Sequence, residues 1–139
     1  MRFSLIVFLL VLFQISWAQT KLDKTLKKFN TESVPYIYPR DLSLTGNTIL
    51  LDTRKKEEFD VSHLKNAIWV GYKDFNKKTV ASKIPDKTVT IVVYCSIGVR
   101  SENIGEKLIA LGYQNVHNLY GGIFDWKNKA QHHQSAIRS

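Results

Sequence analysis

The stretch TVTIVVYCSIGVRSENIGEKLIALG, residues 88–112, decides the fold. Its opening part, 88–94, is rich in β-branched side chains and predicts a strand. Its closing part, 101–112, predicts an amphipathic helix whose apolar face carries Ile104, Leu108 and Leu111. A strand that runs directly into a helix is the repeating unit of a parallel sheet with helices packed on it.

Outward from this unit, strand-like and helix-like segments alternate along the chain. The apolar, strand-like segments are 34–38, 48–52, 67–70 and 116–120, and Pro35 favours an edge position for the first of them. The helix-like segments are 55–60, 72–84 and 122–130. This alternation predicts one α/β domain over 33–130, with a mainly parallel central sheet flanked by helices on both faces. The polar segment 131–139 is expected to be a flexible tail.

The N-terminal stretch MRFSLIVFLLVLFQISWAQT has the layout of a secretory signal peptide. Arg2 supplies a positive start, an apolar run follows, and Ser16 and Ala18 are small residues suited to cleavage after Ala18. The apolar run is shorter than the roughly 20 residues of a membrane-spanning helix, so a retained anchor is the less favoured alternative. We expect 1–18 to be removed on export to the periplasm or the outside, with no stable membrane insertion afterwards. We expect 19–32 to form a polar, basic leader with a single helical turn.

The chain carries 20 Lys and Arg against 12 Asp and Glu, a formal net charge of +8. There is no arginine-rich run and no alternation of basic and aromatic residues, so nucleic acid is not the expected partner. Anionic lipid and small anions stay open as partners of a basic surface, but for most of these lysines we expect a solvated surface that keeps a monomeric protein soluble. The one cysteine, Cys95, excludes an intramolecular disulfide, which leaves intermolecular pairing, a buried inert thiol or a reactive thiol.

The place of Cys95, after the predicted strand and before the predicted helix, favours a reactive thiol. The carboxyl ends of strands carry the chemistry in open α/β sheets, and a helix start offers N–H groups without helical partners. Arg100 adds a positive charge at the edge of the loop between Cys95 and the helix. A loop with a glycine, which tolerates a positive φ, can curl its N–H groups around the sulfur. The residues of this loop are Ser96, Ile97, Gly98 and Val99.

The sequence CSIGVRS at 95–101 resembles the active-site loop of rhodanese-domain sulfurtransferases, which often reads C-x-x-G-x-R-[ST]. Two further stretches stand in the family's order. ILLDTRKKEEFDVSHLKNAIWV at 49–70 is similar to a segment with Asp-x-Arg and a His before an Ala-Ile strand. LGYQNVHNLYGGIFDW at 111–126 is similar to the closing segment with Leu-Gly, Gly-Gly and Trp. The resemblance covers 33–130, and its architecture is that of the small exported rhodaneses of the phage-shock type.

The resemblance implies a sulfurtransferase that works without a metal or an organic cofactor. Cys95 would take a sulfur from thiosulfate or a similar small anionic donor, hold it as a persulfide, and pass it to cyanide or another thiophilic acceptor. Ser101 would support the loop. The implied substrate-binding residues are Ser96, Ile97, Gly98, Val99 and Arg100. Several family members carry a basic residue where this chain has Ser96.

Asp52 and Arg54 match the family's Asp-x-Arg and have two interpretations. They would orient the loop 95–101 (the sulfur loop), or they would be purely structural, as an ion pair or a helix cap, for example Arg54 with Glu57 or Glu58. The structural interpretation is favoured. His63 matches a position that we regard as structural. No histidine has the spacing of a metal ligand, so no metal site is expected.

Two other functions stay open from the sequence. Cysteine phosphatases and arsenate reductases of related fold also use a Cys-loop-Arg. Those phosphatases have five residues between Cys and Arg, because a tetrahedral phosphate needs a wide cradle, whereas only 96–99 intervene here. A carrier that delivers sulfur to a partner protein would use the same thiol as a free enzyme, so the sequence does not separate those two functions.

Overall fold

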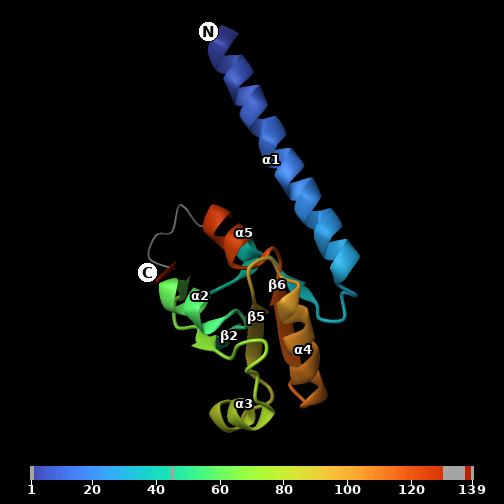
Figure 1. The fold of residues 1–139 in the computed structure, drawn as a ribbon, viewed down its shortest axis with the longest axis vertical. Coiled ribbons are helices and arrows are strands. Elements are labelled where there is room, and N and C mark those ends of the chain that lie inside the picture. The colour runs from blue at the N-terminus through green and yellow to red at the C-terminus, as the bar shows by residue number, and fades with distance from the viewer. Residues whose placement is uncertain (1, 45, 130–136, 139) are drawn as a thin grey trace. The chain divides into compact units, whose positions relative to one another are not determined.

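The computed structural model describes residues 2–44, 46–129 and 137–138. The chain divides into two compact units, residues 1–31 and residues 32–139. The first unit is a single helix (Figure 1). The second unit contains the sheet and the other helices of the described residues.

Helix α1 (Arg2–Phe29) runs without a break past Ala18. The expectation of a single helical turn within 19–32 is therefore wrong, because 19–29 are helical throughout. This stretch is rich in Lys and Leu and contains neither Gly nor Pro, so no residue stops a helix that begins in the apolar segment. By length and composition α1 is able to cross a membrane, and a signal sequence near the N-terminus has the same properties.

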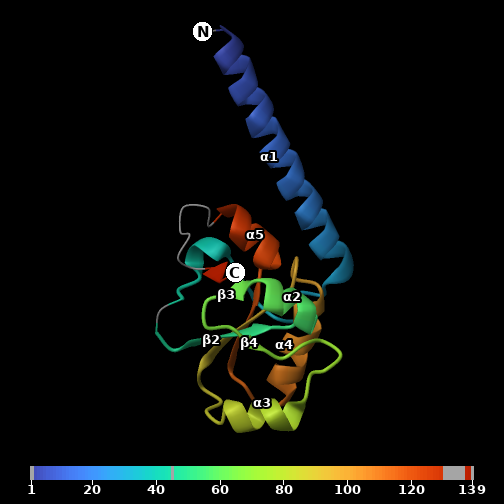
Figure 2. The same cartoon turned by 60° about the vertical axis from the view of Figure 1, so that its left-hand side comes forward.

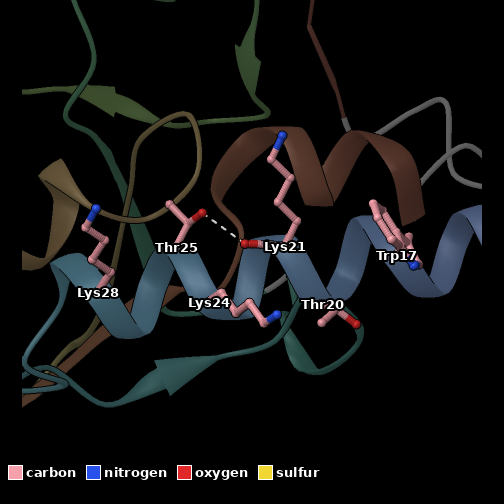
Figure 3. A pocket seen from close by; sticks show the side chains of 6 residues that line it. All are labelled: Trp17, Thr20, Lys21, Lys24, Thr25 and Lys28. Atoms are coloured by element: carbon pink, nitrogen blue, oxygen red, sulfur yellow. Dashed lines mark hydrogen bonds between the residues drawn. The ribbon is translucent and has the colours of Figure 1, made fainter.

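A hollow of about 460 Å³ lies along α1 (Figure 3). The Thr25 hydroxyl donates to the Lys21 carbonyl at 2.9 Å, so this side chain turns back onto its own helix. The lining residues, all from α1, are Trp17, Thr20, Lys21, Lys24, Thr25 and Lys28. None of them is a site residue predicted from the sequence.

The second unit is built on a five-stranded sheet in which every neighbouring pair is parallel. In spatial order the strands are β1 (Tyr36–Ile37), β6 (Asn115–Leu119), β5 (Thr90–Tyr94), β2 (Thr48–Asp52) and β4 (Ile68–Trp69). The most β-branched segment thus forms the central strand, and the segment with Pro35 forms an edge strand, as the sequence predicts. β2 and β5 pair so that Asp52 lies beside Tyr94 at their carboxyl ends.

Helices cover both faces of this sheet, which confirms the predicted α/β architecture. Successive side chains of β5 enter opposite cores because strand side chains alternate. Ile91 and Val93 pack with residues of α3 and α4, whereas Val92 and Tyr94 pack with residues of α5. Figures 1 and 2 show α3 and α5 at opposite ends of the sheet. The helices are the 3-10 helix η1 (Pro39–Asp41), α2 (Lys56–Val61), α3 (Lys77–Lys83), α4 (Arg100–Ala110) and α5 (Gly122–Lys129).

The helix expected over 72–84 is shorter than predicted, because it forms only at α3. The Asn76 side chain accepts a hydrogen bond from the Thr79 N–H at 3.0 Å. This bond satisfies a donor of the first turn and sets the helix start. Tyr72 and the residues up to Asn76 therefore remain outside the helix.

A short antiparallel pair joins β3 (His63–Leu64) to β7 (Ile137–Arg138), and the sequence predicts neither strand. β7 lies inside the segment 131–139 that is expected to be a flexible tail. Ile137 and Arg138 are therefore paired with β3 and are not loose chain. The reason is that the edge of β3 offers backbone N–H and C=O groups for hydrogen bonding. The remainder of the predicted tail lies outside the described residues.

Candidate functional site

Cys95 lies directly after β5, at the carboxyl edge of the sheet. The residue is 1% exposed and its thiol is free. Its Sγ accepts a hydrogen bond from the Gly98 N–H at 3.1 Å and lies 3.5 Å from the hydroxyl oxygen of Ser101, a second donor. Two donors directed at one sulfur stabilise a negative charge on it.

Gly98 gives the loop its curvature. Its φ of 105° is one that a residue with a side chain rarely adopts, in agreement with the expectation from the sequence. Val99 is the N-cap of α4, so the helix begins at Arg100. Among the described hydrogen bonds, the Gly98 N–H is the one loop amide bonded to the sulfur, and the second donor is the Ser101 side chain. The half-buried loop residues are Ser96, Ile97 and Val99.

The start of α5 holds the sulfur loop through two backbone hydrogen bonds. The Ile123 N–H donates to the Cys95 carbonyl at 2.9 Å, and the Phe124 N–H donates to the Ser96 carbonyl at 3.1 Å. Such a close approach requires Gly122, because a Cβ at this position would lie 2.4 Å from the Cys95 carbonyl oxygen. The Gly-Gly pair is part of the family resemblance of the sequence, but the sequence does not predict that this pair contacts the loop.

Arg100 lies at the rim of the loop and has two polar partners. Its Nη2 donates to the Ser96 hydroxyl oxygen at 3.0 Å, and its Nη1 lies 3.7 Å from a carboxylate oxygen of Glu58 in α2. About a third of each side chain of the Arg100–Glu58 pair is exposed, so water screens the attraction. Glu58 therefore offsets part of the positive charge that Arg100 brings to the loop, a contact that the sequence does not predict.

A hollow of about 410 Å³ adjoins Arg100. Its lining comes from the first turn of α2 and the two residues before it, from β4 and the segment that follows it, and from the start of α4. The lining residues are Arg54, Lys55, Lys56, Glu57, Trp69, Tyr72, Lys73, Asp74 and Arg100. Cations outnumber carboxylates in this set, so the surroundings of the loop attract anions.

Asp52 and Arg54 form a buried ion pair. The Arg54 Nε and Nη2 donate to the Asp52 carboxylate at 3.0 and 2.6 Å, and Nη2 also donates to the Ser62 carbonyl. Burial lowers the pKa of Arg54, but the hydrogen bond to Asp52 and its negative charge outweigh burial and raise that pKa above its ordinary value. The favoured structural interpretation fits this geometry, whereas an ion pair of Arg54 with Glu57 or Glu58 does not form.

The Asp52–Arg54 pair also lies beside Tyr94, the last residue before Cys95, with the Arg54 guanidinium 5.9 Å from the centre of the Tyr94 ring. Burial and the negative charge of Asp52 raise the pKa of Tyr94 far above its ordinary value, which keeps the phenol neutral. Its hydroxyl oxygen accepts from the Leu64 N–H at 3.2 Å. Its carbonyl accepts from both the N–H and the hydroxyl of Thr53, at 2.9 and 3.0 Å. The carboxyl end of β2 thus fixes the backbone that leads into the sulfur loop.

Asn118 of β6 is a buried polar residue that the sequence analysis misses. Its side-chain Nδ2 donates to the Gly98 carbonyl at 2.8 Å, and its Oδ1 accepts from the Ser101 hydroxyl at 2.7 Å. The available signal is a polar residue near the carboxyl end of a buried strand, beside β5, the strand that Cys95 directly follows. Such a position lies at the edge where α/β sheets place their chemistry.

The described residues contain no group of three or more His, Cys, Asp and Glu side chains that could hold a metal ion. The ring of His63 stacks on that of Phe59, and its Nδ1 lies 2.9 Å from the Phe59 carbonyl oxygen. This histidine therefore packs against the end of α2.

Comparison with known proteins identifies the family of the chain. The family model of the rhodanese-like domain matches residues 40–129. The tRNA uridine(34) hydroxylase of Photorhabdus laumondii subsp. laumondii is 33% identical over 95 residues, which cover 66% of this chain and 27% of that protein. The adenylyltransferase and sulfurtransferase UBA4 of Candida albicans is 38% identical over 85 residues, which cover 58% of this chain and 19% of that protein. A solved structure, rhodanese with anions from E. coli, is 33% identical with a TM-score of 0.51 and covers 56% of this chain and 89% of that one.

The chain spans 27% and 19% of the lengths of these two curated relatives, whose names describe different activities. The matched region runs from η1 to the end of α5, so it contains the sheet from β2 to β6 and the whole sulfur loop. The chain belongs to the rhodanese-like domain family.

Proposed function

We propose that this chain is a sulfurtransferase that carries a sulfur atom on Cys95 as a persulfide. The observation behind the proposal is the pair of donors at Sγ, the Gly98 N–H and the Ser101 hydroxyl. Donors that stabilise a thiolate also stabilise the negative outer sulfur of a persulfide close by. One relative named as a sulfurtransferase supports sulfur transfer in general, whereas thiosulfate and cyanide are our choice of substrates.

In the first half-reaction the Cys95 thiolate attacks the outer sulfur of thiosulfate. A bond forms between Sγ and that sulfur, the sulfur–sulfur bond of thiosulfate breaks, and its electron pair leaves with sulfite. In the second half-reaction cyanide attacks the outer sulfur of the persulfide through carbon. Thiocyanate leaves, and the electron pair of the broken bond returns to Sγ as the thiolate. This is covalent catalysis in two steps, and neither step needs an external oxidant or reductant.

Burial of the thiol limits what can reach it. Cys95 is 1% exposed, so a sulfur donor has to be narrow at the end that carries the transferred sulfur. Four residues separate Cys95 from Arg100, which favours a single sulfur over a tetrahedral phosphate. Anions gather at the rim because Arg100 and the lysines of the adjoining hollow are positive.

The test of this function is thiocyanate formation by the purified chain from thiosulfate and cyanide. Thiocyanate above the uncatalysed rate supports the proposal. Hydrolysis of an aryl phosphate without thiocyanate would reject it in favour of a phosphatase. A persulfide that forms but passes to neither cyanide nor a small thiol would indicate a carrier for a partner protein.

Arg100→Ala is expected to raise the KM for thiosulfate about threefold to tenfold at low ionic strength with little change in kcat, because a charge at the rim acts on capture of an anion. Salt should imitate this substitution in the wild type by screening. Glu58→Gln is the matched opposite, since it removes the carboxylate beside Arg100, and it should lower KM. Steady-state rates at low and high salt measure both. A wild-type kcat/KM for Arg100→Ala at low salt contradicts this function of Arg100.

We also propose export, with cleavage after Ala18, so that the mature protein begins at Gln19. The proposal rests on the apolar start of α1 and the small residues Ser16 and Ala18. Amino-terminal sequencing of the protein recovered from outside the cytoplasm should read from Gln19. Recovery of a membrane-bound protein that still carries residues before Ser16 would show a retained anchor instead.

A further inference from the structure

Asn118 links β6 to the sulfur loop through both ends of its side-chain amide. Its Nδ2 donates to the Gly98 carbonyl, and its Oδ1 accepts from the Ser101 hydroxyl. A carbonyl oxygen only accepts, so the bond to Gly98 determines which end of the amide is nitrogen. Asn118 is fully buried, so water does not compete for either bond.

The Ser101 hydroxyl has one hydrogen and two acceptors within reach. Asn118 Oδ1 lies at 2.7 Å and Cys95 Sγ at 3.5 Å. While the sulfur is a neutral thiol, the amide oxygen holds the hydrogen, because a thiol sulfur is a weak acceptor. When Sγ is a thiolate it becomes the stronger acceptor, since a bond to an ionised group is about twice as strong as a neutral one.

We infer that Asn118 is a positioning residue for sulfur transfer. Its Oδ1 holds the Ser101 oxygen within reach of the sulfur. It also accepts the hydrogen bond of the Ser101 hydroxyl while the sulfur is neutral. Its Nδ2 holds the Gly98 carbonyl and so keeps Gly98 at the φ at which its N–H points at Sγ. The inference rests on the proposed sulfur transfer, and it assigns a function to a residue outside the loop.

Two substitutions of Asn118 test this function. Aspartate keeps the shape, loses the donor to the Gly98 carbonyl and adds a negative charge near the sulfur. Leucine keeps a similar volume and removes both bonds. We expect each to lower kcat for thiosulfate about tenfold to a hundredfold. For Asn118→Leu the KM should change less than about threefold, because this variant adds no charge and Arg100 at the rim is untouched.

Asn115→Asp is the matched control. Asn115 lies on the same strand, is exposed, and also donates its amide to a backbone carbonyl, that of Thr88 at 2.8 Å. This variant should transfer sulfur at the wild-type rate. Thermal unfolding of every variant shows whether the fold is kept. If Asn118→Asp does not fold, Asn118→Leu and the double-variant comparison below decide the question.

A double-variant comparison separates positioning from mere support of the fold. If Asn118 acts through Ser101, then Ser101→Ala slows persulfide formation strongly in the wild type and only weakly in Asn118→Leu, because coupled residues are not additive. Equal losses in the two backgrounds, or a wild-type kcat in both Asn118 variants, would overturn the inference. A wild-type protein that forms no persulfide from thiosulfate would instead overturn the proposed function, so the two failures are distinguishable.

Discussion

Cys95→Ser is expected to abolish sulfur transfer, lowering thiocyanate formation from thiosulfate and cyanide by at least about a thousandfold. A serine oxygen is a poor nucleophile towards sulfur and forms no persulfide. The fold should persist, because serine is close in size to cysteine and can accept the same hydrogen bond from the Gly98 N–H. We expect the free energy of unfolding to change by about 1 kcal/mol.

The measurement is thiocyanate production by both proteins, together with a thermal melt. Folded Cys95→Ser with no thiocyanate above the uncatalysed rate is the expected outcome. A variant that still produces thiocyanate at a tenth of the wild-type rate or faster would show that another group carries the sulfur.

Gly122→Ala is expected to distort the sulfur loop and to lower transfer at least about tenfold. A Cβ at Gly122 would lie 2.4 Å from the Cys95 carbonyl oxygen and 2.6 Å from the carbonyl carbon of Ser96, closer than atoms pack. α5 would then have to separate from the loop, breaking the bonds from Ile123 and Phe124. Adding the cost of a φ of 59° for alanine, we expect a loss of about 3 to 4 kcal/mol in the free energy of unfolding.

Gly112→Ala is the matched control for the cost of placing alanine at a positive φ. Gly112 also has a positive φ, 92°, but nothing lies within 4 Å of a Cβ built there. Alanine at this position should cost about 1 to 2 kcal/mol and leave sulfur transfer unchanged. Denaturant unfolding and transfer rates of the two variants decide the matter. Equal effects of the two substitutions would show that the close contact of Gly122 with the loop is unimportant.

The sequence predicts those parts of the site that lie close together along the chain. The strand before Cys95 follows from its β-branched residues, the curl of the loop from Gly98, and the helix after it from apolar spacing. All of this information lies within 88–112, so pattern and spacing are sufficient. The same holds for the parallel sheet, because alternating strands and helices leave few other topologies.

The parts that the sequence does not predict join residues far apart in the chain. Asn118 is 20 residues from Gly98 and 17 from Ser101, and no local pattern pairs them. Glu58 meets Ser96 and Arg100 only because α2 and the loop lie at the same edge of the sheet. These contacts depend on the packed sheet, in which neighbouring strands end side by side.

The error at α1 has a different cause. The onset of lysines after Ala18 marks a change in polarity, which is the signal of a cleavage region, but polarity does not end a helix. Lysine and leucine are good helix formers, so the helix continues through this polar segment and ends at Phe29.

The most direct test of the central claim is the intact mass of the purified protein before and after thiosulfate. We predict that the wild type gains the mass of one sulfur atom, that cyanide removes it, and that Cys95→Ser gains none. A wild-type mass that does not change with thiosulfate, or a gain of sulfur that Cys95→Ser shares, would contradict the claim that Cys95 carries the transferred sulfur.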